Sequence, residues 1–300
     1  MKRYSIIIIA LIVLGSLNAG VHENAGEYGY QFLEIPFNPV SMALAGRGVH
    51  SADNNASWIL QPASNCLAYG KNVAVSHSIW IGETAFSTAA YSYSKRSSHL
   101  GLALRNLSYG EIEKRDETGF LIGYYEPVDI AVNGNYSLRL KPWLYAGANL
   151  GVIYQKLDTA SSLALGADLG LTLLPPLEDS AISLAFRNLG VSNDTDEEAV
   201  KLPYSLDLDL YKGFNLAGQK LGLEASLFKT PDADLRYTVS AEVKLLERLS
   251  LRGGYKLNYD AEGLTAGLGI AISRFVIDYG FAAFEEGLED VHSFGLSYNF

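Results

Sequence analysis

Large apolar residues alternate with small or polar ones over most of the chain. Between Leu163 and Leu173, every odd-numbered residue is leucine or alanine, and the residues between them are alanine, glycine, aspartate and threonine. A period of two is typical of a β-strand, because successive side chains point to opposite faces. The second face is rich in glycine and sparsely charged, unlike the solvent-facing side of a soluble sandwich. The pattern therefore favours a membrane barrel, with large apolar residues facing lipid and small or polar ones facing the lumen.

The alternation predicts fourteen strands between residue 72 and the C-terminus. Their expected ranges are 72–80, 83–95, 98–107, 127–138, 142–156, 161–173, 180–190, 202–213, 219–229, 235–246, 249–258, 262–272, 274–284 and 290–300. An even number places both ends of a barrel on the same side, as in bacterial outer-membrane barrels. The predicted fold class is all-β, a 14-stranded antiparallel transmembrane β-barrel of the outer membrane with an N-terminal plug segment.

The connections between these strands fall into two groups. The two longest, 108–126 and 191–201, follow odd-numbered strands, whereas most connections after even-numbered strands are tight turns; a very short odd-numbered connection at Ile81-Gly82 is the exception. Acidic residues dominate the odd-numbered connections and basic residues the even-numbered ones. Because periplasmic turns are short and extracellular loops long, we expect the odd-numbered connections to be extracellular.

The first nineteen residues have the layout of a secretory signal peptide. Lys2 and Arg3 precede an apolar run over 6–14, and Ala19 offers a small residue at a cleavage site. The run is shorter than the roughly 20 residues that span a bilayer, which disfavours the alternative of an uncleaved anchor. We therefore expect residues 1–19 to be cleaved and the protein to be exported to the outer membrane of a Gram-negative bacterium.

The next stretch, 20–71, does not join the alternation that characterises 72–300. It contains three prolines and scattered apolar residues, and one short helix is expected over Ala56–Leu60, capped by Asn54 or Asn55. We interpret it as a plug folded into the lumen, the alternative being a disordered periplasmic leader.

Composition excludes several other function classes. The net charge of −10 argues against nucleic acid as a partner, since that binding depends on neutralising phosphates with Lys and Arg. The single cysteine, Cys66, excludes a disulfide framework. The five histidines are scattered, and no Gly-x-Ser-x-Gly elbow is present. The sequence thus predicts a protein that is not an enzyme, with no catalytic, cofactor-binding or metal-ligating residues.

The C-terminal strand carries a more specific pattern. Phe294, Leu296, Tyr298 and Phe300 alternate with small or polar residues, and the chain ends on the aromatic ring. These four residues resemble the insertion signal of outer-membrane barrels, which implies the barrel-assembly machinery and outer-membrane lipids as partners; an ordinary amphipathic last strand is the alternative.

Two arginines stand out among the residues expected on the lumenal face. Arg105 and Arg187 occur in related Arg-Asn-Leu stretches near the extracellular ends of odd-numbered strands. They are candidates for the rim of the lumen, where paired guanidinium groups can bind a carboxylate or hold acidic plug and loop residues. The alternative is a structural network of ion pairs with the expected lumenal acids, which are Asp168, Asp207, Asp209, Glu224 and Asp278.

Several short motifs, in this order, resemble the PorV/PorQ family. They are Tyr28–Pro36, Met42–Gly46, Ser51–Ala56, Tyr109–Ile112, Asp116–Gly119 and Phe186–Gly190. The aromatic-x-Phe-Leu-x-Ile-Pro start is closest to the PorQ side. The chain departs from the family where Gln61-Pro62-Ala63 replaces the usual Asn-Pro-Ala, which weakens any transfer of plug function.

The resemblance implies both a fold and a role. The family is related to the long-chain fatty-acid transporter barrels, which are fourteen-stranded with an N-terminal plug. Its PorV and PorQ members belong to the type IX secretion system, where they carry or anchor secreted and surface proteins. The first expectation is therefore a non-enzymatic protein that binds or shuttles such proteins. The alternative is transport of hydrophobic small molecules, and a third possibility is a mainly structural barrel.

Overall fold

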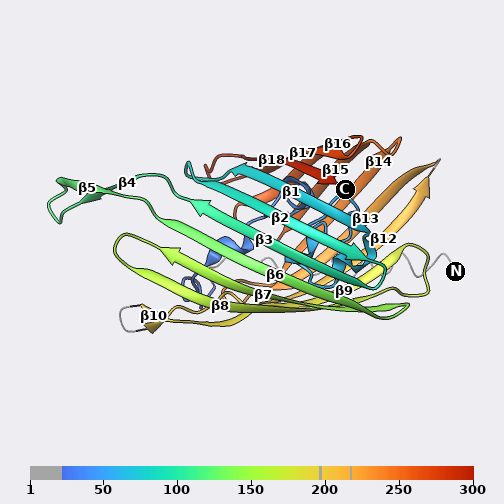
Figure 1. The fold of residues 1–300 in the computed structure, drawn as a ribbon. Helices are drawn as coiled ribbons and strands as arrows, with labels where there is room; N and C mark the ends of the chain where they lie inside the picture. Colours follow the sequence, from blue (N-terminus) through green and yellow to red (C-terminus); the bar gives the residue numbers. More distant parts are fainter. Residues whose placement is uncertain (1–21, 196–197, 217) are drawn as a thin grey trace.

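The computed structural model describes residues 22–195, 198–216 and 218–300. Fourteen antiparallel strands form a closed barrel (Figure 1), which confirms the predicted fold class. The barrel strands are β1 (Gly70–Ile79), β2 (Ala85–Lys95), β3 (Ser98–Ser108), β6 (Val128–Lys141), β7 (Leu144–Lys156), β8 (Ser161–Leu173), β9 (Ser180–Ser192), β12 (Ser205–Leu216), β13 (Gln219–Lys229), β14 (Arg236–Leu245), β15 (Leu249–Leu257), β16 (Glu262–Ile272), β17 (Phe275–Phe284) and β18 (Val291–Asn299).

The barrel closes between its first and last strands. β1 pairs with β18 from Asn72 opposite Asn299 to Ile79 opposite His292, and every other barrel strand pairs with its neighbour in chain order. Closure leaves no barrel strand with an unpaired edge, which is the condition for a sheet to cross lipid. No helix in the described part of the chain is long and apolar enough to span a bilayer.

The two ends of the barrel differ in their connections. One end, which we call the loop end, carries two additional hairpins (left in Figure 1): β4–β5 (Ile112–Arg115 and Leu121–Tyr125) and β10–β11 (Asp194–Thr195 and Glu198–Ala199). The opposite end, the turn end, has connections such as Arg96-Ser97. The long hairpins lie in the connections expected to be extracellular.

Several strand boundaries differ from the sequence prediction by one to three residues, and two of these differences have clear local reasons. β12 begins at Ser205 rather than 202, because Leu202 turns inward and is buried and Pro203 has no N–H to donate to a neighbouring strand. β2 begins at Ala85 rather than 83, because Glu83 has a positive φ of 60° in the preceding turn.

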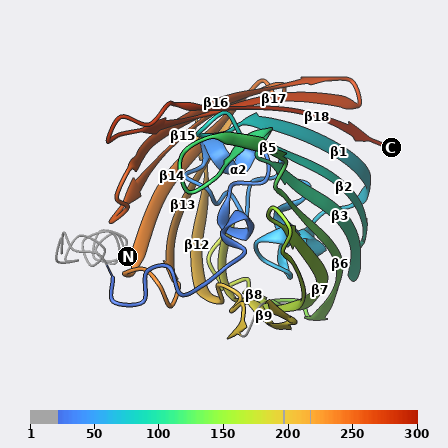
Figure 2. The same cartoon turned by 90° about the vertical axis from the view of Figure 1, so that its left-hand side faces the viewer.

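From residue 32 to the first barrel strand, the chain lies inside the lumen (Figure 2). It forms short helical turns rather than long elements: η1 (Gln31–Glu34), α2 (Pro39–Ala43), η2 (Ser57–Ile59) and η3 (Ser64–Leu67). α2 begins where Pro39 presets a helical φ and the Asn38 side chain accepts a hydrogen bond from the Ser41 N–H at 2.8 Å.

The expected helix over Ala56–Leu60 is shorter, and its expected cap is wrong. The turn is the 3-10 helix η2, and no side chain caps it. Asn54 is instead engaged elsewhere in the plug, since its side chain donates to the Gly48 carbonyl and accepts from Asn38. Because the Asn54 side chain makes these contacts with residues earlier in the plug, it does not cap η2 as the local sequence pattern predicted.

Lumenal glycines let the plug approach the wall. A Cβ at Gly101 would lie 2.4 Å from the Trp58 ring, and one at Gly147 would lie 2.2 Å from the Pro62 carbonyl oxygen. Contacts this short are sterically forbidden, so any larger residue would displace the plug. The small residues predicted on the lumenal face thus form the surface against which the plug packs.

Candidate functional site: a cavity at the loop end of the lumen

The plug enters the lumen from the loop end. Asn24 donates to the Pro231 carbonyl at 3.1 Å, the Gly29 N–H donates to the Lys201 carbonyl at 3.0 Å, and Gln31 donates to Asp232 at 2.8 Å. Lys201, Pro231 and Asp232 all belong to loop-end connections. Residues 22–31 therefore lie across this mouth of the barrel before the chain turns inward.

One side of the lumen meets the plug through apolar and amide contacts. We call β2, β3, β6, β7 and β8 the amide wall. Trp58 is fully buried there, and its indole N–H donates to Ser92 at 3.0 Å. Asn149 donates to the Trp58 carbonyl at 3.0 Å, and Asn135 donates to the Pro62 carbonyl at 3.1 Å. Around these bonds the plug buries further apolar side chains, among them Phe32, Leu33, Ile59 and Leu60.

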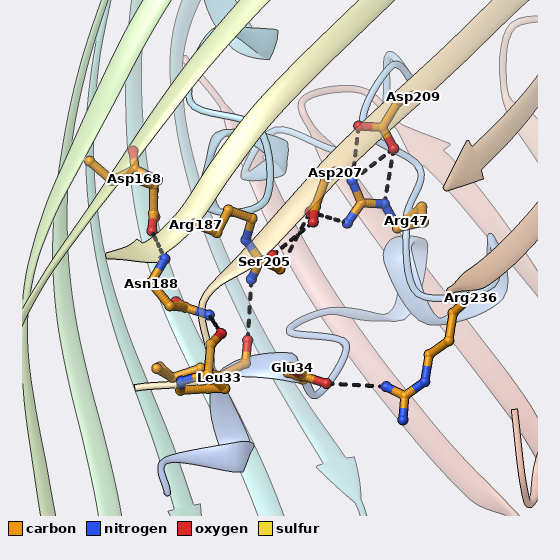
Figure 3. Close-up of polar contacts among 12 residues, drawn as sticks. Leu33, Glu34, Arg47, Asp168, Arg187, Asn188, Ser205, Asp207, Asp209 and Arg236 are labelled. Carbon is orange, nitrogen blue, oxygen red and sulfur yellow. Dashed lines mark hydrogen bonds and ion pairs between the residues drawn. The ribbon is translucent and has the colours of Figure 1, made fainter. Parts of the chain in front are cut away.

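The other side packs against α2 and also meets the plug through charges. We call β12 to β17 the charged wall. Arg47 of the plug is buried and donates to Asp207 at 2.7 Å and to both oxygens of Asp209 at 2.7 and 2.8 Å (Figure 3). Because the planar guanidinium donates to two carboxylates at once, both the position and the orientation of Arg47 are fixed.

A wall carboxylate also binds the plug backbone. Glu224 accepts hydrogen bonds from the N–H groups of Gly48, Val49 and His50 at 2.9 to 3.1 Å. His50 in turn pairs its Nε2 with the Ser183 hydroxyl at 3.0 Å. Burial, with Arg47 nearby, lowers the pKa of His50 to about 4, so its imidazole is neutral at neutral pH.

A second ionic cluster surrounds Arg252 of β15. Its guanidinium reaches Asp53 of the plug at 2.8 Å, Glu242 at 2.7 Å and Asp278 at 2.7 Å. Burial acts to raise the pKa of Asp53, but Lys244 and Arg252, with other hydrogen bonds, hold it below its ordinary value. Asp53 is therefore ionised at neutral pH and ties the plug to the wall.

The structure brings the two predicted rim arginines to one atom. Arg105 and Arg187 are both buried, and both donate to the Leu33 carbonyl oxygen, at 3.5 and 3.3 Å. Arg187 also pairs with Asp207 at 3.3 Å (Figure 3), whereas Arg105 donates to the Asn133 amide oxygen at 3.0 Å. They lie inside the lumen beneath the plug entry rather than on an open rim.

The other predicted lumenal acids are divided between the two walls. Asp207, Asp209, Glu224 and Asp278 join the charged wall, as described above. Asp168 of the amide wall has no arginine partner among the described ion pairs; it accepts instead from Asn149 at 2.8 Å and from the Asn188 N–H at 2.7 Å. Asn188 has a positive φ of 55°, within the irregular pairing of β8 with β9.

The C-terminal residues proposed as an insertion signal lie at the outer surface. Phe294 and Leu296 of β18 are exposed on the outside of the barrel, and Phe300 follows the last strand. The centre of the Tyr298 ring lies 4.8 Å from the centres of the Phe275 and Phe300 rings, and the three rings form an aromatic cluster at the turn end. The predicted signal peptide, residues 1–19, lies outside the described residues.

Between the plug and the charged wall, the loop end holds a cavity of about 220 Å³. Its apolar lining includes Ile35, Leu60, Trp80 and Phe228, and its polar lining includes the groups that link η1 to β14 and β15. The exposed Gln31 lines it as well, so the cavity adjoins the mouth of the barrel. An engineered cavity of about 150 Å³ binds benzene, so this volume is sufficient for a one-ring molecule.

Two ion pairs and the aromatic ring of Tyr259 line this cavity. Arg236 pairs with Glu34 at 3.3 Å, and its guanidinium lies 5.0 Å from the centre of the Tyr259 ring. Lys256 pairs with Glu262. Burial raises the pKa of Glu34 to about 7, although Arg236 opposes the shift.

The plug residues that organise these contacts were missed by reasoning from sequence. No pattern in the sequence assigns a role to Arg47, Glu34 or Asp53. A usable signal existed, because the expected lumenal acids outnumbered the expected lumenal arginines and Arg47 was a cation within the plug. Among the described residues there is no group of three or more histidine, cysteine or acidic side chains that could hold a metal ion.

No family model matches this chain, and no curated protein matches it. Solved structures do resemble it. The toluene transporter TodX of Pseudomonas putida has a TM-score of 0.66 at 12% identity, over 87% of this chain and 97% of that one. The CymD monoaromatic hydrocarbon channel has a TM-score of 0.64 at 13% identity, over 89% and 98%. A Pseudomonas aeruginosa FadL homologue has a TM-score of 0.57 at 12% identity, over 88% and 98%. At these identities the likeness shows the fold, a FadL-like outer-membrane barrel.

Proposed function

We propose that this protein is a non-enzymatic outer-membrane channel that admits small, largely hydrophobic organic molecules. The observation that carries the proposal is a plugged fourteen-stranded barrel with a cavity of about 220 Å³ next to its loop-end mouth. Two of the similar structures are a toluene transporter and a monoaromatic hydrocarbon channel, which supports the same ligand class.

The proposal includes localisation and assembly. The outward band of leucine, valine and aromatic residues fits lipid, and the exposed C-terminal aromatic residues suit recognition by the barrel-assembly machinery. Export through a cleaved signal peptide over residues 1–19 remains part of this proposal.

Transport through a plugged barrel requires the plug to move, and this can be tested with one reversible crosslink. An ideal Cβ on Gly254 of β15 lies 3.0 Å from the Ala45 Cβ, which is about 0.5 Å below the range found in disulfides, so a crosslink here requires Ala45 to shift slightly away from the wall. Ala45→Cys with Gly254→Cys, in a Cys66→Ser background, should join plug to wall on oxidation. We expect cells producing the oxidised form to take up labelled toluene at the rate of cells without the protein, and reductant to restore uptake.

The single-cysteine variants serve as matched controls and should be insensitive to oxidation. Uptake by the wild type that does not exceed uptake by cells lacking the protein would contradict the channel function. Equal uptake by the oxidised and reduced double variant would instead contradict the role of plug movement.

A second candidate function, in protein secretion, is favoured by one feature of the loop end. The β4–β5 hairpin projects beyond the barrel (Figure 1), and Phe120, Leu121, Ile122 and Tyr124 on it are exposed. An exposed apolar hairpin is a common feature of protein-binding surfaces. Together with the PorV/PorQ-like motifs, it supports a type IX-like component that binds secreted proteins.

Photocrosslinking from the native cell surface separates the two candidates. A benzophenone residue at Glu117, at the tip of this hairpin, should capture secreted proteins that share a C-terminal domain or a dedicated surface partner. The same residue at Glu285, in another loop-end connection, is the control. Capture of no protein from Glu117 in efficiently displayed barrels would exclude the secretion role and leave the channel.

A further inference from the structure

The loop-end cavity contains polar atoms that the protein leaves without partners. Within the described residues, the Thr230 hydroxyl, the Glu34 Oε1 and the Arg187 Nε are buried without a hydrogen-bond partner, and all three residues line this cavity. Thr230 and Arg187 are 2% and 5% exposed. Buried polar groups are nearly always hydrogen-bonded, so three such atoms around one cavity indicate a polar occupant.

The missing partners are of both kinds. A carboxylate oxygen such as Glu34 Oε1 needs a donor when ionised, a guanidinium nitrogen such as Arg187 Nε needs an acceptor, and the Thr230 hydroxyl can use either. A hydroxyl group is the smallest substituent that both donates and accepts. A pure hydrocarbon would satisfy none of the three atoms.

The charges around the cavity are already balanced. The cations of its lining are each paired with a carboxylate: Arg47 with Asp207 and Asp209, Arg187 with Asp207, Arg236 with Glu34, and Lys256 with Glu262. An anionic ligand would therefore bring an unpaired charge into a buried site next to Glu34 and Glu262, which is unfavourable. The remaining lining, with Ile35, Leu60, Trp80 and Phe228, accommodates an apolar ring.

We infer that the cavity binds a small neutral aromatic molecule that carries a hydroxyl group, in preference to a hydrocarbon or a carboxylate. This inference rests on the proposed channel function and narrows its ligand class. The hydroxyl group lies among Thr230, Glu34 and Arg187, and the ring packs against the apolar lining. Selectivity arises because the site leaves its polar atoms unpaired when the hydroxyl is missing.

Three probes built on one ring test this selectivity. Toluene, p-cresol and p-toluate share a methylated ring and differ only in carrying hydrogen, hydroxyl or carboxylate opposite the methyl group. In calorimetric titrations of the purified barrel in detergent, we expect p-cresol to bind at least about tenfold more tightly than toluene, and p-toluate to bind most weakly.

Removing one hydroxyl from the site should remove part of this preference. Thr230→Val retains the side-chain shape and should weaken p-cresol binding by about three- to tenfold without changing toluene binding. Thr88→Val is the matched control, because the Thr88 hydroxyl is also buried without a partner but lines a different, smaller cavity near β1 and β18. It should change neither affinity.

The outcomes distinguish this inference from the proposed function. Equal or tighter binding of toluene, tightest binding of p-toluate, or an equal loss for both neutral probes in Thr230→Val would overturn the hydroxyl preference. Toluene uptake in cells together with any of these results leaves the channel function standing. Absence of both toluene uptake and binding of all three probes would overturn both.

Discussion

The two walls of the lumen hold the same plug by different means. The amide wall packs closely on Trp58 and Pro62, with glycines where the plug comes nearest and neutral amides bonded to plug carbonyls. The charged wall also approaches the plug closely, at Gly267 and Gly280. In addition, it pairs the plug's Arg47 and Asp53 with buried ions, and Glu34 with the partly buried Arg236. Close packing stabilises any arrangement in which the surfaces fit, whereas a buried ion is strongly destabilising unless all of its charged partners are in place. We infer that close packing on both walls stabilises the plug and that the ions of the charged wall fix its position.

The largest expected effect comes from an incomplete ion set at the charged wall. Arg252→Met leaves the buried Asp278 and the partly buried Glu242 without their guanidinium partner and takes one of the two cations from Asp53. The free energy of unfolding should fall by about 3–5 kcal/mol, as measured by urea unfolding in lipid vesicles.

The matched control is the exposed Arg248 at the turn end. Arg248→Met should change the free energy of unfolding by less than about 0.5 kcal/mol. Similar losses for both variants would show that the Arg252 cluster contributes no more than a surface charge does.

The amide wall should respond to volume rather than to charge. Gly147→Ala places a methyl group where the Pro62 carbonyl oxygen lies, so the plug must shift, and the free energy of unfolding should fall by about 1–3 kcal/mol. On the neighbouring strand β6, a Cβ added to Gly134 would meet no other atom within 4 Å. Gly134→Ala should be nearly neutral in the same assay, and a comparable loss there would mean that the effect belongs to the strand and not to the plug.

The third prediction concerns the Leu33 carbonyl, which accepts hydrogen bonds from Arg105 of the amide wall and from Arg187 of β9. Arg105→Met with Arg187→Met removes both donors to the Leu33 carbonyl but retains side-chain volume. We expect residues 22–35 to open more often, so that limited proteolysis of the loop end is about tenfold faster, equivalent to about 1.4 kcal/mol. Unchanged protease resistance would show that the apolar packing of Phe32 and Leu33 holds this segment alone.

The fold was predictable because barrel strands follow a local rule. Alternation with a period of two depends only on neighbouring residues, and it identified all the barrel strands with small errors at their ends. The plug was less predictable, because its structure depends on partners far along the chain. Arg47 and Asp209 are 162 residues apart, and no spacing near Arg47 indicates that it binds there. The alternation did, however, identify the lumenal acids, so counting their charges against the plug's cations would have suggested ionic docking.

The smallest effect should come from pH at Glu34, the one plug acid whose pKa is raised to about 7. Its ordinary value is 4.5, so between these two pH values the docked plug holds a proton that the undocked segment has released. Docking is therefore most favourable below about pH 4.5 and weakens as pH rises to 7, by about 1 kcal/mol once solvent screening at this 21% exposed side chain is allowed for. Hydrogen exchange of the amides of residues 31–36, corrected for intrinsic rates, should show this loss of protection between pH 5 and 7.5.

Glu34→Gln should abolish the pH dependence of this protection, whereas Glu27→Gln, at an exposed ion pair with Lys201, should retain it. Protection that rises with pH in the wild type would mean that the Arg236 ion pair outweighs burial, and the charged wall would then hold η1 through the ionised carboxylate.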